Sequence, residues 1–287
     1  MSAKVRNPLA PARATRIIIL AVIGALFAVP IASMVEFTLR DPKTGGHTLD
    51  NWAGLFAPDA ASTYEVVWTG IGNSLLLSAF AVAVVLLILV PTMVYVEVEF
   101  PRLSRVLEFI CLIPLSLPAI VLVVGYVPVY QFIGRIVGTD VWSLGFAYGI
   151  IVLPFAHRAI KSNLDAIGIR VLSEAGRTLG DSWFGFLRRV AVPNLRGGIS
   201  AAVLITVAVV FGEFTLASLL NRTNLQTALN IINWQNPFVS VAISLVSLIA
   251  VFLLLLAVSG LGRVGVRRAR RTATPKSVSP TPLRGTR

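Results

Sequence analysis

The sequence predicts an all-α integral membrane protein, built as a bundle of six membrane-spanning helices. Hydrophobic residues make up 56% of the 287-residue chain and charged residues only 13%, and the mean hydropathy is +0.82. Because a soluble protein carries about 25% charged residues, this composition indicates a chain that dissolves in a bilayer. The apolar residues also gather in long runs, and a helix needs a run of about 20 to cross the hydrocarbon core.

Six such runs follow one another without a soluble domain between them. The expected spans cover about residues 17–39, 71–96, 107–130, 141–159, 198–220 and 238–261. The membrane domain, residues 17–261, lies between a basic tail, 1–16, and a second basic tail, 262–287, which is expected to be disordered. Small residues in the first run leave cleavage as a signal peptide open, but its length and the five later runs favour a span.

The third span, 107–130, is unusual because Pro114, Pro118 and Gly125 lie inside it. Proline leaves a backbone carbonyl without its helical partner, and lipid offers no hydrogen bond in its place. Such a span is expected to line a cavity or to pack against other protein. A structural kink is the alternative explanation.

The fifth span, 198–220, contains Glu213, the only carboxylate well inside any expected span. A carboxylate at that depth costs several kcal/mol unless it meets water, a partner or a substrate. Glu213 is therefore the first candidate for lining a transport pathway. The alternatives are a protonated or hydrogen-bonded Glu between helices, or one that reaches the outer interface.

Positive charge is distributed unevenly and gives the expected orientation. If both termini are cytoplasmic, the inner segments hold 21 Lys and Arg residues and the outer segments hold four, Arg40, Lys43, Arg135 and Arg222. The positive-inside rule favours this orientation, which places loop 160–197 in the cytoplasm. Contact with anionic membrane lipid then explains the net charge of +12 without a nucleic acid partner.

The residues give little support to enzyme or metal chemistry. Cys111 is the single cysteine and lies in an apolar run, so an intrachain disulfide or a cysteine-rich metal site is impossible. The two histidines, His47 and His157, are far apart in sequence, and no paired carboxylates or Ser-His-Asp arrangement stands out. We expect no catalytic residue, metal or cofactor in this chain.

The polar and basic loop 160–197 carries the most informative pattern. Apolar residues recur four apart from Val171 to Leu179, which predicts a short helix, and Gly180 is suited to end it. The two residues that follow are good N-caps, so a second short helix is expected to begin there and to stop at Pro193.

The first of these helices has features of a docking surface. The small pair Ala175-Gly176 removes bulk, so a partner surface could approach the helix backbone closely. Glu174 complements the helix dipole near its start, and Arg177 supplies donors for a partner's carboxylates.

This motif resembles the EAA loop of ABC importer membrane subunits, the binding-protein-dependent permeases. The matching residues are Glu174, Ala175, Gly176, Gly180, Val190, Val192 and Pro193. Gly176 stands where Ala is usual, and Val190 and Val192 stand where Ile and Leu are usual. In the family this loop is the coupling helix, which docks in a groove on the cytoplasmic ATPase subunit. The resemblance implies ATPase docking by Glu174, Ala175, Gly176, Arg177, Gly180 and Pro193.

The resemblance implies a six-span importer permease with a cytoplasmic coupling helix in the bacterial inner membrane. The sequence contains no GxxxxGK[ST] loop, so ATP and Mg²⁺ are expected in a separate cytoplasmic ABC ATPase dimer. A second, identical or related permease subunit and an extracytoplasmic solute-binding protein are the other implied partners. The implied mechanism is alternating access, in which closure of the ATPase moves the coupling helices and opens the bundle outward.

The substrate is expected to be a polyamine. The runs 211–215 and 114–118 most resemble the permeases of spermidine/putrescine importers, although phosphonate, ferric-ion, thiamine, oxyanion and sugar permeases remain alternatives. An intramembrane carboxylate suits a cation, because a Glu facing an ammonium offsets the desolvation cost of both. The expected pathway residues are Glu213, Pro114, Pro118 and Gly125.

Two other functional classes stay open. In a secondary transporter or channel subunit, Glu213 would carry protons or ions and loop 160–197 would only be cytoplasmic. In a membrane scaffold, the loop would recruit a soluble protein without transport. The EAA-like motif argues against the transporter or channel. ATPase assays separate all three classes, because only an importer permease predicts a co-purified ATPase that a loaded binding protein stimulates.

Overall fold

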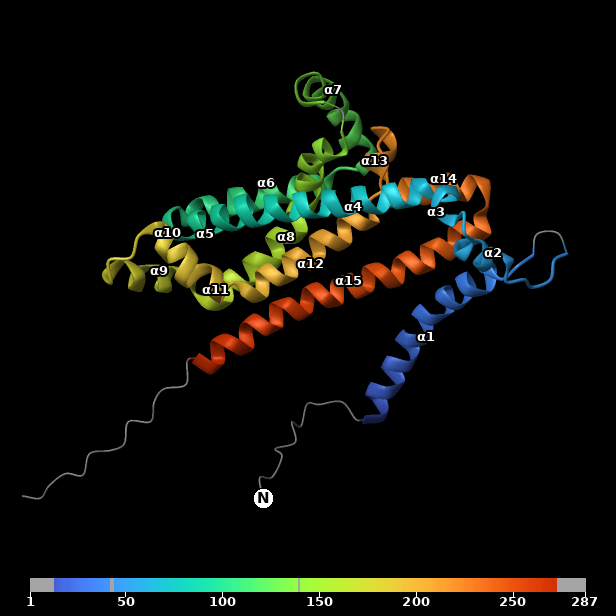
Figure 1. Ribbon diagram of the computed structural model, residues 1–287. Helices are drawn as coiled ribbons and strands as arrows, with labels where there is room; N and C mark the ends of the chain where they lie inside the picture. Colours follow the sequence, from blue (N-terminus) through green and yellow to red (C-terminus); the bar gives the residue numbers. More distant parts are fainter. Residues whose placement is uncertain (1–12, 42–43, 139, 273–287) are drawn as a thin grey trace, which may run out of the picture. The chain divides into compact units, whose positions relative to one another are not determined.

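The computed structural model describes residues 13–41, 44–138 and 140–272. These residues form helices, and the only β-structure among them is an isolated bridge between Arg40 and His47. The predicted all-α class is therefore confirmed (Figure 1). In the described part of the chain, five helices are long and apolar enough to cross a membrane, or six if the bent pair Trp183–Asn194 and Arg196–Gly212 is one span.

The chain divides into two units, which are described separately. The first comprises Met1–Gly70 with Leu225–Ala250, and the second comprises Ile71–Asn224 with Val251–Arg287. The helices of the first unit are α1 (Arg13–Thr38), α2 (Asp50–Ala53), η1 (Gly54–Phe56), α3 (Ala60–Thr63), the first turns of α4 (Glu65–Val84), α14 (Leu225–Gln235) and the first part of α15 (Pro237–Thr272).

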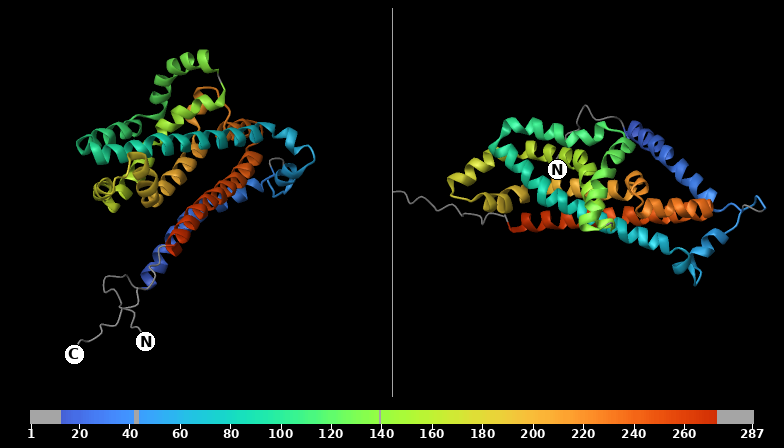
Figure 2. Two further views of the ribbon diagram at one scale, coloured as in Figure 1. Left: turned by 60° about the vertical axis from the view of Figure 1, so that its left-hand side comes forward. Right: turned by 90° about the horizontal axis from the view of Figure 1, so that it is seen from above.

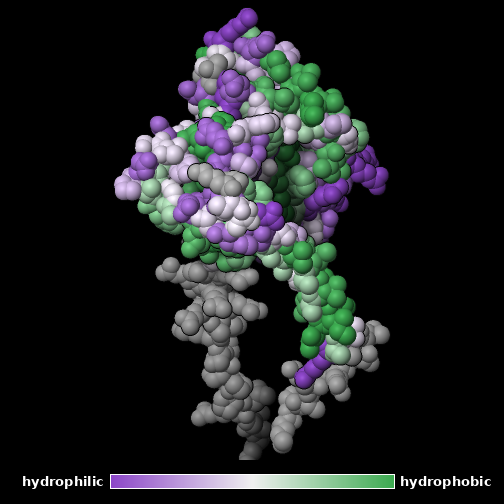
Figure 3. Space-filling model, turned by 90° about the vertical axis from the view of Figure 1, so that its right-hand side faces the viewer, coloured by the Kyte–Doolittle hydropathy of each residue, from purple (hydrophilic) through white to green (hydrophobic). Residues whose placement is uncertain are grey.

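Helix α1 presents apolar side chains along its whole length. None of its most hydrophobic 18-residue window is buried, and Figure 3 shows it as a column of hydrophobic surface. Its carboxyl end is fastened, because the Asn51 side-chain amide donates to the Thr38 carbonyl at 2.9 Å and the Trp52 indole donates to the Thr38 hydroxyl at 3.0 Å. A helix with such a surface suits a lipid environment.

Both ends of the described chain differ slightly from the expected tails. Helix α1 begins at Arg13, and residues 1–12 lie outside the described residues. Helix α15 begins at Pro237, where the Asn236 side chain caps it by accepting from the backbone amides of the two residues after the proline. It runs to Thr272, so part of the expected C-terminal tail is helical, and residues 273–287 lie outside the described residues.

The second unit contains the rest of α4 and of α15 and all the helices between η2 and α13. These are η2 (Val85–Leu89), α5 (Val90–Glu99), η3 (Pro101–Leu103), α6 (Ser104–Ser116), α7 (Ala119–Val137), η4 (Val141–Leu144), α8 (Gly145–Ile167), α9 (Ile169–Thr178), α10 (Trp183–Phe186), η5 (Leu187–Ala191), α11 (Val192–Asn194), α12 (Arg196–Gly212) and α13 (Thr215–Leu219). Helices α8 and α12 lie side by side (Figures 1 and 2).

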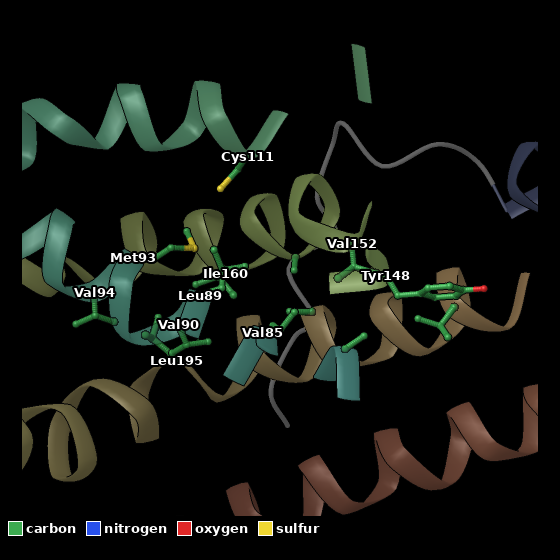
Figure 4. Packing of buried hydrophobic residues seen from close by; sticks show 14 of the residues in the cluster. Val85, Leu89, Val90, Met93, Val94, Cys111, Tyr148, Val152, Ile160 and Leu195 are labelled. Atoms are coloured by element: carbon green, nitrogen blue, oxygen red, sulfur yellow. The ribbon is translucent and has the colours of Figure 1, made fainter. Parts of the chain in front are cut away.

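The core of the second unit is built around α8. Figure 4 shows Tyr148, Val152 and Ile160 of α8 among buried side chains from η2, α5 and α6. Small residues allow α12 to approach α8 closely. A Cβ atom added to Gly198 would lie 2.7 Å from the Cβ of Asn163 and 3.0 Å from a backbone carbonyl of α8. Close backbone approach at small residues is how membrane helices commonly pack.

Two of the expected spans are interrupted in the structure. The third, 107–130, is divided between α6 and α7, because Leu117 is extended and Pro118 begins the next helix. The fifth, 198–220, ends its long helix at Gly212, and Glu213 is extended before α13 begins. Both breaks expose backbone groups that must find partners inside the protein.

Candidate docking loop and membrane cavity

Helix α9 has one face turned into the protein and one turned away from it. Ile169, Ser173 and Gly176 are buried and recur at the spacing of one helical face. On the opposite face Val171 is 70% exposed and Leu179 is 86% exposed. The apolar stripe predicted from the sequence is therefore the outward face, and the motif residues Glu174 and Ala175 are exposed beside it.

Gly180 shapes the end of α9. Its φ of +75° is in the left-handed region, which glycine adopts without a side-chain clash. The amide of Gly180 donates to the carbonyl of Arg177 at 2.9 Å, and the amide of Asp181 donates to the carbonyl of Gly176 at 3.0 Å. These two bonds form a Schellman motif. Ser182 then caps α10 by accepting from the Gly185 amide at 3.2 Å.

Gly176 lies on the inner face of α9, where α10 of the same chain approaches the helix closely. A Cβ atom there would lie 3.3 Å from Cδ2 of Phe186, a buried residue of α10. From the sequence, the close approach at this small pair was expected from a partner surface. The small residue allows α9 and α10 to pack together, while Ala175 remains on the outward face.

Pro193 lies in α11, just before the chain bends. The helical segment 183–194 meets α12 at an angle of 76°. A π-helical segment, η5, precedes the proline, because its ring clashes with the carbonyl four residues earlier and interrupts the regular bonding. The helical segment ends at Asn194, one residue beyond the end predicted at Pro193, and Pro193 thus lies at the elbow between the loop and the long helix.

Carboxylates at the end of α5 hold α9 in place. Glu97 Oε1 accepts from Arg170 Nη2 at 2.7 Å, and the Glu97 carbonyl accepts from Arg170 Nε at 3.0 Å. Glu99 forms an ion pair with Arg177, which lies about two turns further along the same side of α9. Neither glutamate was among the site residues predicted from the sequence. Their position directly after an apolar span was the available signal.

A cavity of about 390 Å³ lies among α6, α8, α12 and the break before α13. Its lining includes Pro114, Ile151, Pro154, Phe155, Glu213 and Phe214. The structure thus brings together two of the predicted pathway residues, Glu213 and Pro114. The other two, Pro118 and Gly125, are exposed and are not part of this lining.

Glu213 accepts hydrogen bonds from two directions. One carboxylate oxygen accepts from the Leu216 amide at 2.7 Å, so the side chain caps α13. The other accepts from the Tyr148 hydroxyl at 2.8 Å. Asn224 donates to that hydroxyl at 3.0 Å and to the Glu213 carbonyl at 2.6 Å, which satisfies the interrupted backbone. Tyr148 and Asn224 were not among the pathway residues predicted from the sequence.

The described residues contain no group of three or more His, Cys, Asp or Glu side chains that could hold a metal ion. Several apolar helices and a half-buried carboxylate at a helix break define a polytopic membrane protein, and an amphipathic loop presents an exposed apolar face.

The chain belongs to the family of binding-protein-dependent transport system inner membrane components, which it matches over residues 94–271. This confirms the family predicted from the EAA-like motif. It is 31% identical to a probable ABC transporter permease protein of Sinorhizobium fredii, over 66% of this chain and 34% of that protein. It is 29% identical to a probable molybdenum ABC transporter permease protein of Haloferax volcanii, over 56% of this chain and 63% of that protein.

A third relative is the spermidine/putrescine transport system permease protein PotB of Haemophilus influenzae, which is 28% identical over 72% of this chain and 77% of that protein. The chain spans about a third of the length of the Sinorhizobium relative and less than two thirds of the Haloferax one. The family and the apolar helices together make this a multi-pass inner membrane protein.

Proposed function

We propose that this chain is the transmembrane permease subunit of an ATP-driven ABC importer and that α9 docks it on a cytoplasmic ATPase. The observation that carries the proposal is the two-faced character of α9. Its inner face is fastened to α5 by two ion pairs, while Val171 and Leu179 project outward together with Glu174. A helix that is attached to its own protein by ion pairs and exposes an apolar face is suited to bind a partner and to transmit the partner's movement.

The exposed apolar side chains of α9 offer enough binding free energy to contribute to a specific contact with a partner. Burying a leucine or valine side chain stabilises a complex by about 1.5–3 kcal/mol. Phe184 of α10, in the same loop, is also 70% exposed and adds a further apolar side chain. Arg188 adds an exposed guanidinium group in the same loop, which suits a carboxylate on a partner, whereas Arg189 is paired with Asp181 of the same chain.

The remaining components of the proposed importer would be separate subunits. A cytoplasmic ABC ATPase dimer would hold ATP and Mg²⁺ and hydrolyse the ATP. A second permease subunit, identical or related, would complete the pathway, and an extracytoplasmic binding protein would deliver the solute. The positive-inside rule supports an orientation with both termini and residues 160–197 in the cytoplasm.

Co-purification from native membranes tests the docking role. A tagged chain in mild detergent is expected to retain an ATPase, whose activity rises when a loaded binding protein is added. Glu174→Lys reverses a charge on the outward face, and Gly180→Trp strains the left-handed end of α9, so both should uncouple the ATPase. Glu65→Lys makes the same charge reversal at an exposed position outside the loop and should behave as wild type. If Glu174→Lys and Gly180→Trp bind and stimulate the ATPase normally, α9 is not the docking element.

We propose a polyamine as the solute. Glu213 lies on the wall of the cavity, and its hydrogen-bond donors are neutral groups, so its negative charge remains available to an ammonium. Phe155 and Phe214 also line the cavity, and aromatic faces attract organic cations. The PotB relative is named for spermidine and putrescine, which supports this choice.

An oxyanion is the second candidate, because the Haloferax relative is named for molybdenum. Uptake of radiolabelled putrescine into vesicles that contain the complete importer separates the two. Competition by spermidine but not by molybdate supports the polyamine. ATP-dependent uptake of radiolabelled molybdate without uptake of putrescine would make the solute an oxyanion, and no ATP-dependent uptake of either would exclude both. ATP-independent uptake driven by a proton gradient would indicate a secondary transporter instead.

A further inference from the structure

One buried carboxylate joins four helices at the base of α9. We define the Glu97 cluster as Glu97 of α5, Ser104 of α6, Lys161 of α8 and Arg170 of α9. Glu97 Oε2 accepts from Ser104 Oγ and from Lys161 Nζ, each at 2.9 Å, and Glu97 Oε1 accepts from Arg170 Nη2 at 2.7 Å. Both oxygens of one side chain are thus occupied by donors from three other helices.

The cluster is protected from water on its acidic side. The Glu97 side chain is only 10% exposed, whereas the side chains of Glu99 and Arg177 in the second α5–α9 ion pair are 29% and 57% exposed. Ion pairs that are shielded from solvent hold their geometry more firmly than exposed ones, because water screens them less. The Glu97 cluster is therefore the stiffer of the two attachments of α9.

Helix α8 connects this cluster to the cavity. Lys161 lies toward one end of α8, Pro154 and Phe155 line the cavity, and Tyr148 near the other end donates to Glu213. The distance from residue 161 to residue 148 is about 20 Å at the rise of an α-helix. A rigid element of this length that is fixed at both ends can carry a displacement from one end to the other.

We infer that the Glu97 cluster is the joint through which a displacement of α9 reaches α8 and the walls of the cavity. The inference rests on the proposed ATPase docking and assigns the next step in the same chain of contacts. Arg170 and Glu97 are positioning residues in this scheme, since the joint acts through other helices on the solute site.

The test measures the cavity's response to the ATPase. Thr215 lines the cavity, and Thr215→Cys is introduced with Cys111→Ala, which removes the single native cysteine. The complete importer is labelled with N-ethylmaleimide, with and without ATP and vanadate, and the labelling rate of Cys at position 215 is compared. In the otherwise unaltered chain, trapping the ATPase is expected to change this rate.

Arg170→Gln detaches α9 from the cluster and leaves Glu97 paired with Lys161. We expect the ATPase to remain bound and to trap vanadate, while the nucleotide-dependent change in labelling rate is lost. Glu97→Gln should give the same loss, and combining the two should add little, because both break one joint. The matched controls, Arg158→Gln and Glu108→Gln, make the same changes at exposed positions on α8 and α6 and should respond as wild type.

The outcomes are distinguishable. A normal nucleotide-dependent change in labelling rate in Arg170→Gln would contradict the inferred role of the Glu97 cluster. Loss of ATPase binding in that variant would also contradict it, because the cluster would then shape the docking surface itself. If Glu97→Gln does not fold, Arg170→Gln still decides. Failure of the unaltered chain to retain any ATPase would instead overturn the proposed function.

Discussion

Glu213 combines a structural and a candidate functional role in one side chain. Its carboxylate caps α13 and accepts from Tyr148, so the hydrogen-bonded alternative considered from the sequence describes part of its surroundings. The same side chain also lies on the cavity wall. Both hydrogen-bond donors are neutral groups, so neither offsets a negative charge on the carboxylate. The residue can therefore stabilise the break in the helix and still attract a cation.

Replacing Glu213 with Gln is expected to weaken cation uptake without affecting ATPase docking. The amide removes the negative charge from the cavity, and we expect the putrescine concentration for half-maximal uptake to rise about tenfold, which corresponds to about 1.4 kcal/mol. Initial uptake rates in vesicles measure this. Tyr148→Phe is the matched control, because it removes one hydrogen bond and keeps the charge, and its effect should be smaller. Equal loss of expression in both variants would indicate a purely structural role.

Prolines decide where the helices of the second unit change geometry. Pro91 and Pro193 each lie two residues after the end of a π-helical segment, η2 and η5, and Pro118 is the N-cap residue of α7 after a break. In each case the proline cannot donate the bond that would continue a regular helix. Pro114 is accommodated inside α6 and lines the cavity instead. The same residue type thus produces an elbow, a break or a cavity wall, depending on what packs around it.

The contact of α12 with α8 depends on the absence of a side chain at position 198. Gly198→Ala would place a methyl group 2.7 Å from the Asn163 Cβ, and overpacking of this kind costs about 1–3 kcal/mol. We expect a lower thermal unfolding midpoint in detergent. Gly197→Ala is the neighbouring control, because a Cβ there has 3.7 Å to its nearest neighbour, Asn163 Nδ2. An unchanged midpoint for Gly198→Ala would mean that the two helices are less closely packed.

At the scale of the whole molecule, the placement of positive charge predicts which side of the membrane each loop faces. Arg188 lies in loop 160–197 and Ala61 in the segment expected outside, and both are exposed. An impermeant maleimide should label Arg188→Cys only in inverted vesicles and Ala61→Cys only in right-side-out vesicles. Both variants carry Cys111→Ala, so no other thiol is present. The opposite labelling pattern would place α9 outside and exclude docking on a cytoplasmic ATPase.

Short-range properties of the sequence were sufficient for the fold class, the family and the two short helices of the loop. Runs of apolar residues predict spans because every segment meets the same hydrocarbon. Gly180 and Ser182 predict the end of α9 and the start of α10 because helix capping depends only on neighbouring residues. The outward apolar stripe of α9 was also predicted, although not the direction it faces.

By itself, then, the sequence determined an all-α membrane protein of this family with an amphipathic helix in a basic loop. Only the tertiary structure decided which distant residues meet. Arg170 and Glu97 are 73 positions apart, and Tyr148 and Glu213 are 65 apart. The tertiary structure also places Gly176 on the inner face of α9, against Phe186. It places Glu213 and Pro114 in the lining of one cavity, and Pro118 and Gly125 are not part of that lining. Such pairings depend on how the helices pack in three dimensions, and the pattern along a single segment does not contain that information.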